Sequence, residues 1–261
     1  MAGVIVHLGA CGEDAEAMAR DWALLDDAER AQAARYHQPV DRARFVARRG
    51  GRRRLLAAHL GVAPEGLRFG EGAYGKPVLL GHELQFSTSH AGDDWVLAVA
   101  DVPLGCDLAR LDPGFAWREV ARAFFAAVER KALDALAPEE APAAFLEVWA
   151  RKEAMVKALG HGLSFPLDAF IVADGPGAPY QAGVAGWQAA VLWPRPGLCV
   201  AITVQGDAAP QCRLVQPGET WTLPLAEPAA PTPARPKRRL MVSPLRLARR
   251  SPPAQAARHS A

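Results

Sequence analysis

The order in which helical and strand-like segments follow one another is the feature of this sequence that most restricts its fold. Strands are predicted at 4–8, 84–87, 95–100, 104–108, 169–173, 187–193 and 198–204, with a loop at 88–94. Helical periodicity covers 14–36, 41–60, 115–136 and 143–159. Because helices and strands do not alternate as they do in a doubly wound sheet, this order predicts an α+β fold.

The last forty residues differ in composition from the rest of the chain. Residues 222–261 hold eight basic side chains, one acid (Glu227), eight of the 22 prolines and no aromatic residue, so their charge is +7. The 22 basic and 27 acidic residues that remain give residues 1–221 a charge of −5. A segment so basic and so poor in large apolar residues cannot bury enough surface to offset its ordering entropy. We expect a disordered basic tail after a folded region that ends near residue 221.

Cysteine spacing and hydropathy favour a cytoplasmic protein. Cys11, Cys106, Cys199 and Cys212 are irregularly spaced, with no Cys-x-x-Cys pair, so neither a disulfide framework nor a zinc site is indicated. No uncharged apolar run approaches the roughly 18 residues that a membrane helix needs. The first twelve residues lack the basic region of a signal peptide.

The predicted helix at 41–60 is unusually rich in arginine. Its seven arginines are Arg42, Arg44, Arg48, Arg49, Arg52, Arg53 and Arg54. So many guanidinium groups cannot all lie in a core, so one face of this helix must contact solvent or an anion.

Two short segments carry groups suited to phosphate oxygens. Lys76 sits in a turn beside Gly75, and the segment 86–90 reads Phe-Ser-Thr-Ser-His. A Ser–His hydrolase is disfavoured, because there is no Gly-x-Ser-x-Gly elbow and adjacent residues rarely form a nucleophile–base pair. Ser89 and His90 are better suited to binding phosphate.

Two carboxylates are candidates for a metal site. Asp107 ends an apolar strand just after Gly105, whose lack of a side chain admits close approach, and an acid at such a place can ligate magnesium. Glu153 and Lys157 are four residues apart and therefore neighbours on one helix face. Taken alone, an acid at the end of a strand is more often solvated, and a Glu–Lys pair at this spacing is more often an ordinary surface ion pair.

Together, these segments resemble the motifs of a known family. In order, the chain has Gly75-Lys76-Pro77, the segment 86–90, Gly105-Cys106-Asp107, Phe124-Phe125 followed by Glu129, and Trp149-Ala-Arg-Lys152-Glu153-Ala-Met-Val-Lys157. This resembles the phosphopantetheinyl transferases of the larger, surfactin-synthetase-activating type, whose pattern is G-K-P, F-N/S-x-S-H, G-x-D, F-F-x-x-x-E and W-x-x-K-E-A-x-x-K. Each motif is weak alone, but their shared order is specific. The resemblance covers residues 26–204 and excludes the tail.

The resemblance implies a pseudo-twofold fold of two similar α+β halves, with coenzyme A and magnesium (manganese as a substitute) between them. We place the halves at 1–103 and 104–221, followed by the tail at 222–261. The implied reaction moves 4′-phosphopantetheine from coenzyme A to a serine of an apo acyl or peptidyl carrier protein. A chain with both halves fused is expected to be a monomer, with no membrane or specific nucleic-acid partner.

The resemblance also implies the roles of particular residues. Asp107 and Glu153 hold the metal, and Glu153, directly or through a water, takes the proton of the carrier serine. Lys157 neutralises phosphate charge and assists the leaving group. Binding of coenzyme A falls to Arg44, Lys76, Ser89, His90, Lys152 and Lys157, with His90 and Arg44 at the 3′-phosphate.

One position departs from the family pattern. The family usually has a third acidic metal ligand two residues after the aspartate, and here that residue is Ala109. Strand alternation places residue 109 on the same side as Asp107, and magnesium accepts water in place of a carboxylate. We therefore expect activity with altered metal affinity. A catalytically impaired module that binds coenzyme A or a carrier protein is the alternative, and a nucleic-acid binder is a second, motivated by the arginine helix and the basic tail.

Overall fold

The computed structural model describes residues 2–12, 14–112, 114–162, 165–172 and 184–217. The chain divides into two units, Met1–Thr222 and Leu223–Ala261, and every described residue belongs to the first. The predicted basic tail lies outside the described residues. Within the described part, no helix is both long enough and apolar enough to cross a membrane.

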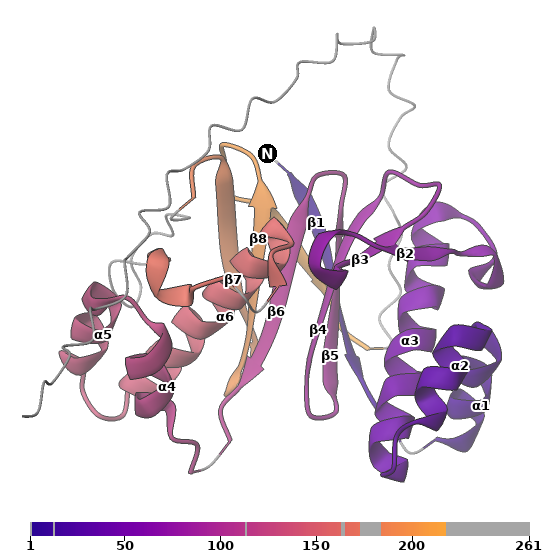
Figure 1. The fold of residues 1–261 in the computed structure, drawn as a ribbon, viewed down its shortest axis with the longest axis horizontal. Coiled ribbons are helices and arrows are strands. Elements are labelled where there is room, and N and C mark those ends of the chain that lie inside the picture. The colour runs from indigo at the N-terminus through magenta and orange to yellow at the C-terminus, as the bar shows by residue number, and fades with distance from the viewer. Residues whose placement is uncertain (1, 13, 113, 163–164, 173–183, 218–261) are drawn as a thin grey trace, which may run out of the picture. The chain divides into compact units, whose positions relative to one another are not determined.

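Helices and strands are mixed along the first unit (Figure 1). The strands are β1 (Gly3–Ala10), β2 (Phe69–Glu71), β3 (Pro77–Leu79), β4 (Gln85–Ala91), β5 (Asp94–Ala100), β6 (Leu104–Arg110), β7 (Trp187–Arg195), β8 (Leu198–Gln205) and β9 (Gln211–Val215). The α-helices are α1 (Ala15–Leu24), α2 (Asp27–Ala34), α3 (Pro39–Leu60), α4 (Trp117–Phe124), α5 (Ala127–Asp134) and α6 (Ala141–Leu159).

The strands form two main sheets and a short hairpin. The first sheet has the order β4-β5-β1-β9, the second has the order β6-β8-β7, and β2 pairs with β3. Neighbouring strands are antiparallel except for β1 and β9, which are parallel. Strand β9 comes from the predicted C-terminal half but completes the sheet of the N-terminal half, so the two halves share a strand.

One apolar core lies between the two sheets, and a long helix covers the outer face of each. Alternate residues of β1, β5, β6 and β8 meet in this core, among them Val6, Ala98, Cys106 and Ile202. Helix α3 packs against the other face of the first sheet, and α6 against the other face of the second (Figure 1). This arrangement confirms the predicted α+β class.

Strand β6 approaches α6 closely because Gly105 has no side chain. A Cβ atom at residue 105 would lie 2.1 Å from the Ala154 carbonyl oxygen and 2.3 Å from the Ala158 nitrogen. Any side chain here would therefore push the helix away from the strand. Since β6 also lies beside β4, the residues that follow Gly105 are close to both α6 and β4.

Three predicted elements differ from the structure. The predicted loop at 88–94 is instead mostly strand, because β4 continues to Ala91 and pairs with β5 along that length. The single helix predicted at 115–136 is two helices, since the chain is extended at Phe125 and Ala126. The strand predicted at 169–173 is absent from its described residues, where Leu167–Ala169 is a 3-10 turn, and Ala173 lies outside the described residues.

A partly buried histidine pair makes stability depend on pH. The Nε2 atoms of His7 and His59 are 2.8 Å apart, and burial lowers the pKa of each ring to about 4. The unfolded chain therefore binds more protons than the folded one between about pH 6.5 and pH 4. The pair's contribution is fully present above this window and is lost as pH falls through it.

We expect the free energy of unfolding, measured by urea titration, to fall by up to about 1.4 kcal/mol per pH unit for each ring across this window. In His59→Gln, whose amide can still bond to His7, about half of this dependence should disappear. His82→Gln at an exposed site is the control. An unchanged slope in His59→Gln would contradict the assignment.

Candidate functional site

Three polar side chains from three elements meet where β4, β6 and α6 come together. The Nζ atom of Lys157 lies 2.6 Å from Oδ1 of Asp107 and donates to the Ser89 hydroxyl at 2.9 Å. The Ser89 hydroxyl in turn donates to Asp107 Oδ1 at 2.7 Å. Burial opposes the charge on Lys157, but the Asp107 carboxylate outweighs it and raises the pKa of the ammonium group. Three of the residues predicted for the site are thus in direct contact.

Glu153 lies one turn before Lys157 on α6. Its carboxylate forms no hydrogen bond or ion pair with the described residues, although it is partly buried. Burial raises its pKa, and the negative charge of Asp107 raises it further. Two carboxylates that disfavour each other's charge are stabilised when a cation binds near both.

The donor set suits a hard divalent cation. Among the described residues, no group of three or more His, Cys, Asp or Glu side chains is arranged to hold a metal. Asp107 and Glu153 nevertheless supply two carboxylates, and magnesium commonly binds one or two carboxylates while it keeps several waters. These two residues fit magnesium.

Asp107 and Glu153 line one cavity of about 370 Å³ together with His90 and Ala109. We call it the carboxylate cavity. Phe115 and Trp149, whose side chains are at least partly exposed, form part of its apolar wall. Residue 109 thus faces the same cavity as Asp107, as strand alternation predicts. Among the described residues that line this cavity, Asp107 and Glu153 are the only carboxylates.

A second cavity, of about 210 Å³, lies between α3 and β4. Arg48, Arg49, Arg52 and His90 line it, together with Gln32, and we call it the arginine pocket. None of the described residues that line it is an aspartate or glutamate. Burial lowers the pKa of His90, and the charges of Arg48 and Lys157 lower it further, so the imidazole has positive neighbours on two sides. Such a pocket is suited to an anion.

A third cavity, of about 240 Å³, has Lys76 in its wall together with Glu153 and Lys157. The ammonium of Lys76 donates to the Leu104 carbonyl at 2.9 Å and to the Ala158 carbonyl at 3.4 Å. Lys76 therefore ties the turn at 73–77 to the second sheet and its helix. Its predicted contact with coenzyme A stays a prediction.

The structure separates two predicted coenzyme A residues from this cluster. Arg44 is not among the residues that line these cavities, since its guanidinium pairs with Asp93 at 2.7 Å and with Asp41. Lys152 is completely buried, and its ammonium contacts Glu129. Lys152 lines none of the three cavities and pairs with a buried carboxylate, which is a structural role, and its predicted contact with coenzyme A stays a prediction.

The arginines that line the pocket were present in the sequence but were not distinguished from Arg44. Helical spacing carries a partial signal, because Arg48 and Arg52 are four residues apart and share one face of α3. Arg44 lies on the same face, so spacing alone could not remove it. Its ion pair with Asp93 depends on a turn 49 residues away in the chain.

Comparison with known proteins shows which family this chain resembles. The family model of the 4′-phosphopantetheinyl transferase superfamily matches residues 103–203, which include Asp107, Glu153 and Lys157. The 4′-phosphopantetheinyl transferase HetI of Nostoc sp. is 33% identical over 190 residues, which span 70% of this chain and 80% of HetI. The chain belongs to the 4′-phosphopantetheinyl transferase superfamily.

Other members of this superfamily are similar over shorter stretches. A 4′-phosphopantetheinyl transferase of Bacillus subtilis is 36% identical over 121 residues, or 46% of this chain and 53% of that protein. A relative from Synechocystis sp. is 34% identical over 163 residues, or 61% of this chain and 66% of the relative. The chain thus spans between half and two thirds of the length of these two superfamily members.

Proposed function

We propose that this protein transfers 4′-phosphopantetheine from coenzyme A to a serine of an apo acyl or peptidyl carrier protein. The observation that carries the proposal is the contact of Asp107, Ser89 and Lys157 beside Glu153, with the arginine pocket next to it. Family membership supports the same activity. We further propose that the protein acts as a cytoplasmic monomer.

In the proposed reaction, the carrier serine hydroxyl attacks the phosphorus that bears the pantetheine group. A bond forms between the serine oxygen and this phosphorus, while the pyrophosphate bond breaks and adenosine 3′,5′-bisphosphate leaves. Glu153, which has no competing partner among the described residues, accepts the serine proton directly or through a water. Lys157 donates hydrogen bonds to the phosphate oxygens on which negative charge develops.

Magnesium would be held by Asp107 and Glu153, and manganese could replace it. When bound there, the metal would offset the charge that develops on the pyrophosphate. Ser89 keeps the Asp107 carboxylate oriented through its 2.7 Å hydrogen bond. His90 lines both the carboxylate cavity and the arginine pocket, which supports a contact with the 3′-phosphate end of coenzyme A.

Mass spectrometry of a carrier protein tests the proposal. The protein is incubated with coenzyme A, magnesium and an apo carrier protein, and the carrier should gain the mass of one phosphopantetheine. A carrier with its acceptor serine changed to alanine is the control and should gain nothing. A panel of acyl and peptidyl carriers then identifies the preferred substrate. A protein that binds coenzyme A but modifies no carrier in the panel would favour the impaired binding module instead.

Ala109→Glu should lower the magnesium concentration that gives half the maximal rate. The new carboxylate would face the cavity that Asp107 and Glu153 line, and an added anionic oxygen strengthens binding of a hard cation. The measurement is a magnesium titration of initial transfer rates. Ala109→Gln, of similar size without the charge, is the matched control. An unmoved midpoint in Ala109→Glu would show that residue 109 does not face the metal.

A further inference from the structure

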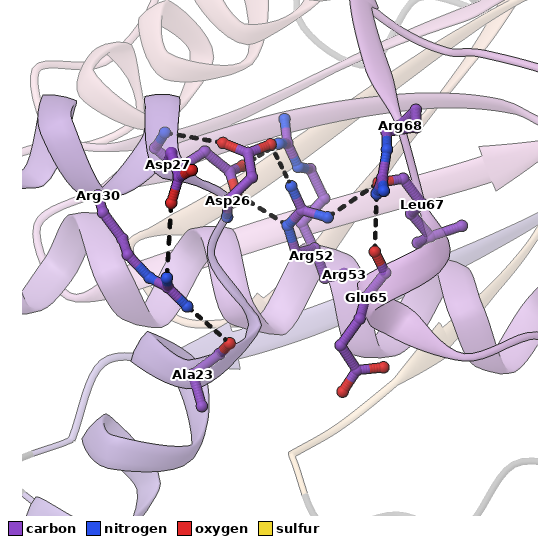
Figure 2. Close-up of polar contacts among 10 residues, drawn as sticks. Ala23, Asp26, Asp27, Arg30, Arg52, Arg53, Glu65, Leu67 and Arg68 are labelled. Atoms are coloured by element: carbon purple, nitrogen blue, oxygen red, sulfur yellow. Dashed lines mark hydrogen bonds and ion pairs between the residues drawn. The ribbon is translucent and has the colours of Figure 1, made fainter.

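Asp94, the first residue of β5, forms ion pairs that cross from the first sheet to the second. The Arg195 guanidinium of β7 donates to its Oδ2 atom at 2.5 Å, and Arg110 of β6 lies 3.9 Å from the same atom. The Asp94 side chain is only 7% exposed, so its charge depends on these two guanidinium groups. Buried Arg53 of α3, by contrast, pairs on its own side of the first sheet, where Figure 2 shows it beside Asp26.

The turn before Asp94 is tight. Strand β4 ends at Ala91, which pairs with Asp94 directly across the hairpin. The two residues between them are Gly92 and Asp93, and Gly92 has the left-handed φ of 61° that such a short hairpin turn favours. Because this turn has no slack, a shift of Asp94 also moves the end of β4, where His90 lies.

Contacts from both sheets hold this turn. A Cβ atom at Gly92 would lie 2.9 Å from an Nη atom of Arg110, so the guanidinium packs directly on the turn. Asp112 holds the Nε atom of Arg110 at 3.1 Å. On the side of the first sheet, Arg44 of α3 pairs with Asp93 at 2.7 Å. The turn is thus fixed from α3, β6 and β7 together.

His90 lies where a small shift of β4 changes the binding of a ligand. It lines both the carboxylate cavity and the arginine pocket. Arg195 is not among the described residues that line these two cavities, so it contacts no ligand there. Any effect of Arg195 on ligand binding therefore passes through the residues that it holds.

We propose that Asp94, held by Arg195 and Arg110, is a positioning residue that fixes His90 between the carboxylate cavity and the arginine pocket. This inference rests on the proposed function, in which His90 contacts the 3′-phosphate end of coenzyme A. A displacement of about 1 Å is enough to weaken the hydrogen bonds of a binding group to its ligand.

Calorimetric binding of adenosine 3′,5′-bisphosphate, the proposed product, tests the inference without any transfer step. Arg195→Leu should weaken binding by on the order of threefold to tenfold, and Arg195→Lys, which keeps the charge, should lie between Arg195→Leu and wild type. Combined with His90→Ala, Arg195→Leu should add little, because its effect passes through the imidazole. Arg213→Leu, at an exposed site on β9, removes the same charge and should bind as wild type does.

Asp94→Asn separates the effect of position from the effect of charge. The change removes a negative charge, so electrostatics alone would strengthen binding of the anionic nucleotide. Loss of the two ion pairs should instead weaken binding by on the order of threefold to tenfold, because His90 is no longer held in place. Asp101→Asn, at an exposed residue, is the matched control and should leave the affinity unchanged.

Thermal unfolding shows which variants fold, and Arg195→Leu, at a half-exposed side chain, carries the test if Asp94→Asn does not fold. The inference is overturned if the losses of Arg195→Leu and His90→Ala add in full, if Arg195→Leu binds as wild type does, or if Asp94→Asn binds more tightly. A wild type that binds no bisphosphate overturns it as well. The proposed function fails separately, if wild type transfers no phosphopantetheine to any carrier. In that event, non-additive losses for the bisphosphate would still support the role of Asp94.

Discussion

Glu153→Gln and Asp107→Asn are each expected to slow phosphopantetheine transfer by on the order of a hundredfold or more. Each change removes one of the two carboxylates that line the carboxylate cavity, and Asp107→Asn also removes the charge that pairs with Lys157. A metal that neutralises developing phosphate charge contributes several kcal/mol, and about 1.4 kcal/mol corresponds to a tenfold change in rate. Initial rates at several magnesium concentrations measure the effect.

Glu139→Gln, at an exposed residue, is the control for loss of one negative charge and should keep the wild-type rate. Each variant is first shown to unfold at a temperature close to that of wild type, so that a slow rate reflects chemistry. If Glu153→Gln transfers at nearly the wild-type rate, then Glu153 neither holds the metal nor accepts the serine proton, and the proposed mechanism is wrong.

Lys152→Met should destabilise the protein by about 3–5 kcal/mol, because it leaves a buried carboxylate without its partner. The side chains of Lys152 and Glu129 are both fully buried, and their charged atoms are 2.8 Å apart. The Lys152 ammonium also donates to the carbonyls of Leu167 and Phe170 at 2.7 Å. Thermal unfolding should show a midpoint lowered by about 6–20 °C.

Lys131→Met, on the exposed face of α5, is the control and should change the midpoint little. In the double variant Lys152→Met with Glu129→Leu, much of the lost stability should return, since neither charge is then buried alone. At temperatures where Lys152→Met is folded, its KM for coenzyme A should match that of wild type. A stable Lys152→Met variant with a raised KM would instead support the contact with coenzyme A that the family motif implied.

The sequence could predict which side chains of the candidate site lie close together because the signals are local. Gly105 and Asp107 belong to one short strand, and Glu153 and Lys157 are one helical turn apart, so spacing alone brings each pair together. The α+β class followed from the order of elements, which needs no knowledge of tertiary contacts.

What could not be predicted depends on contacts between distant segments. Lys152 lies next to Glu153 in the motif, but its partner Glu129 comes from another helix, and only the fold shows that it points away from the site. Arg44 and Arg52 both belong to α3, but their ion pairs differ. Arg44 pairs with Asp93, and Arg52 pairs with Glu29. Strand β9 was not predicted, because its alternation of polar and apolar residues is short. Its partner β1 also lies at the other end of the folded region in sequence.

The pairing of β1 with β9 has a consequence for the protein during its synthesis. Strand β1 is made first, but the strand that covers one of its edges is made about 200 residues later, roughly 10–40 s at ordinary translation rates. Until then β1, with its buried valines Val4 and Val6, has an open row of backbone donors and acceptors. Such an edge can pair with another chain. The nascent protein is therefore most exposed to aggregation before Gln211–Val215 has been added, and slower translation lengthens that interval.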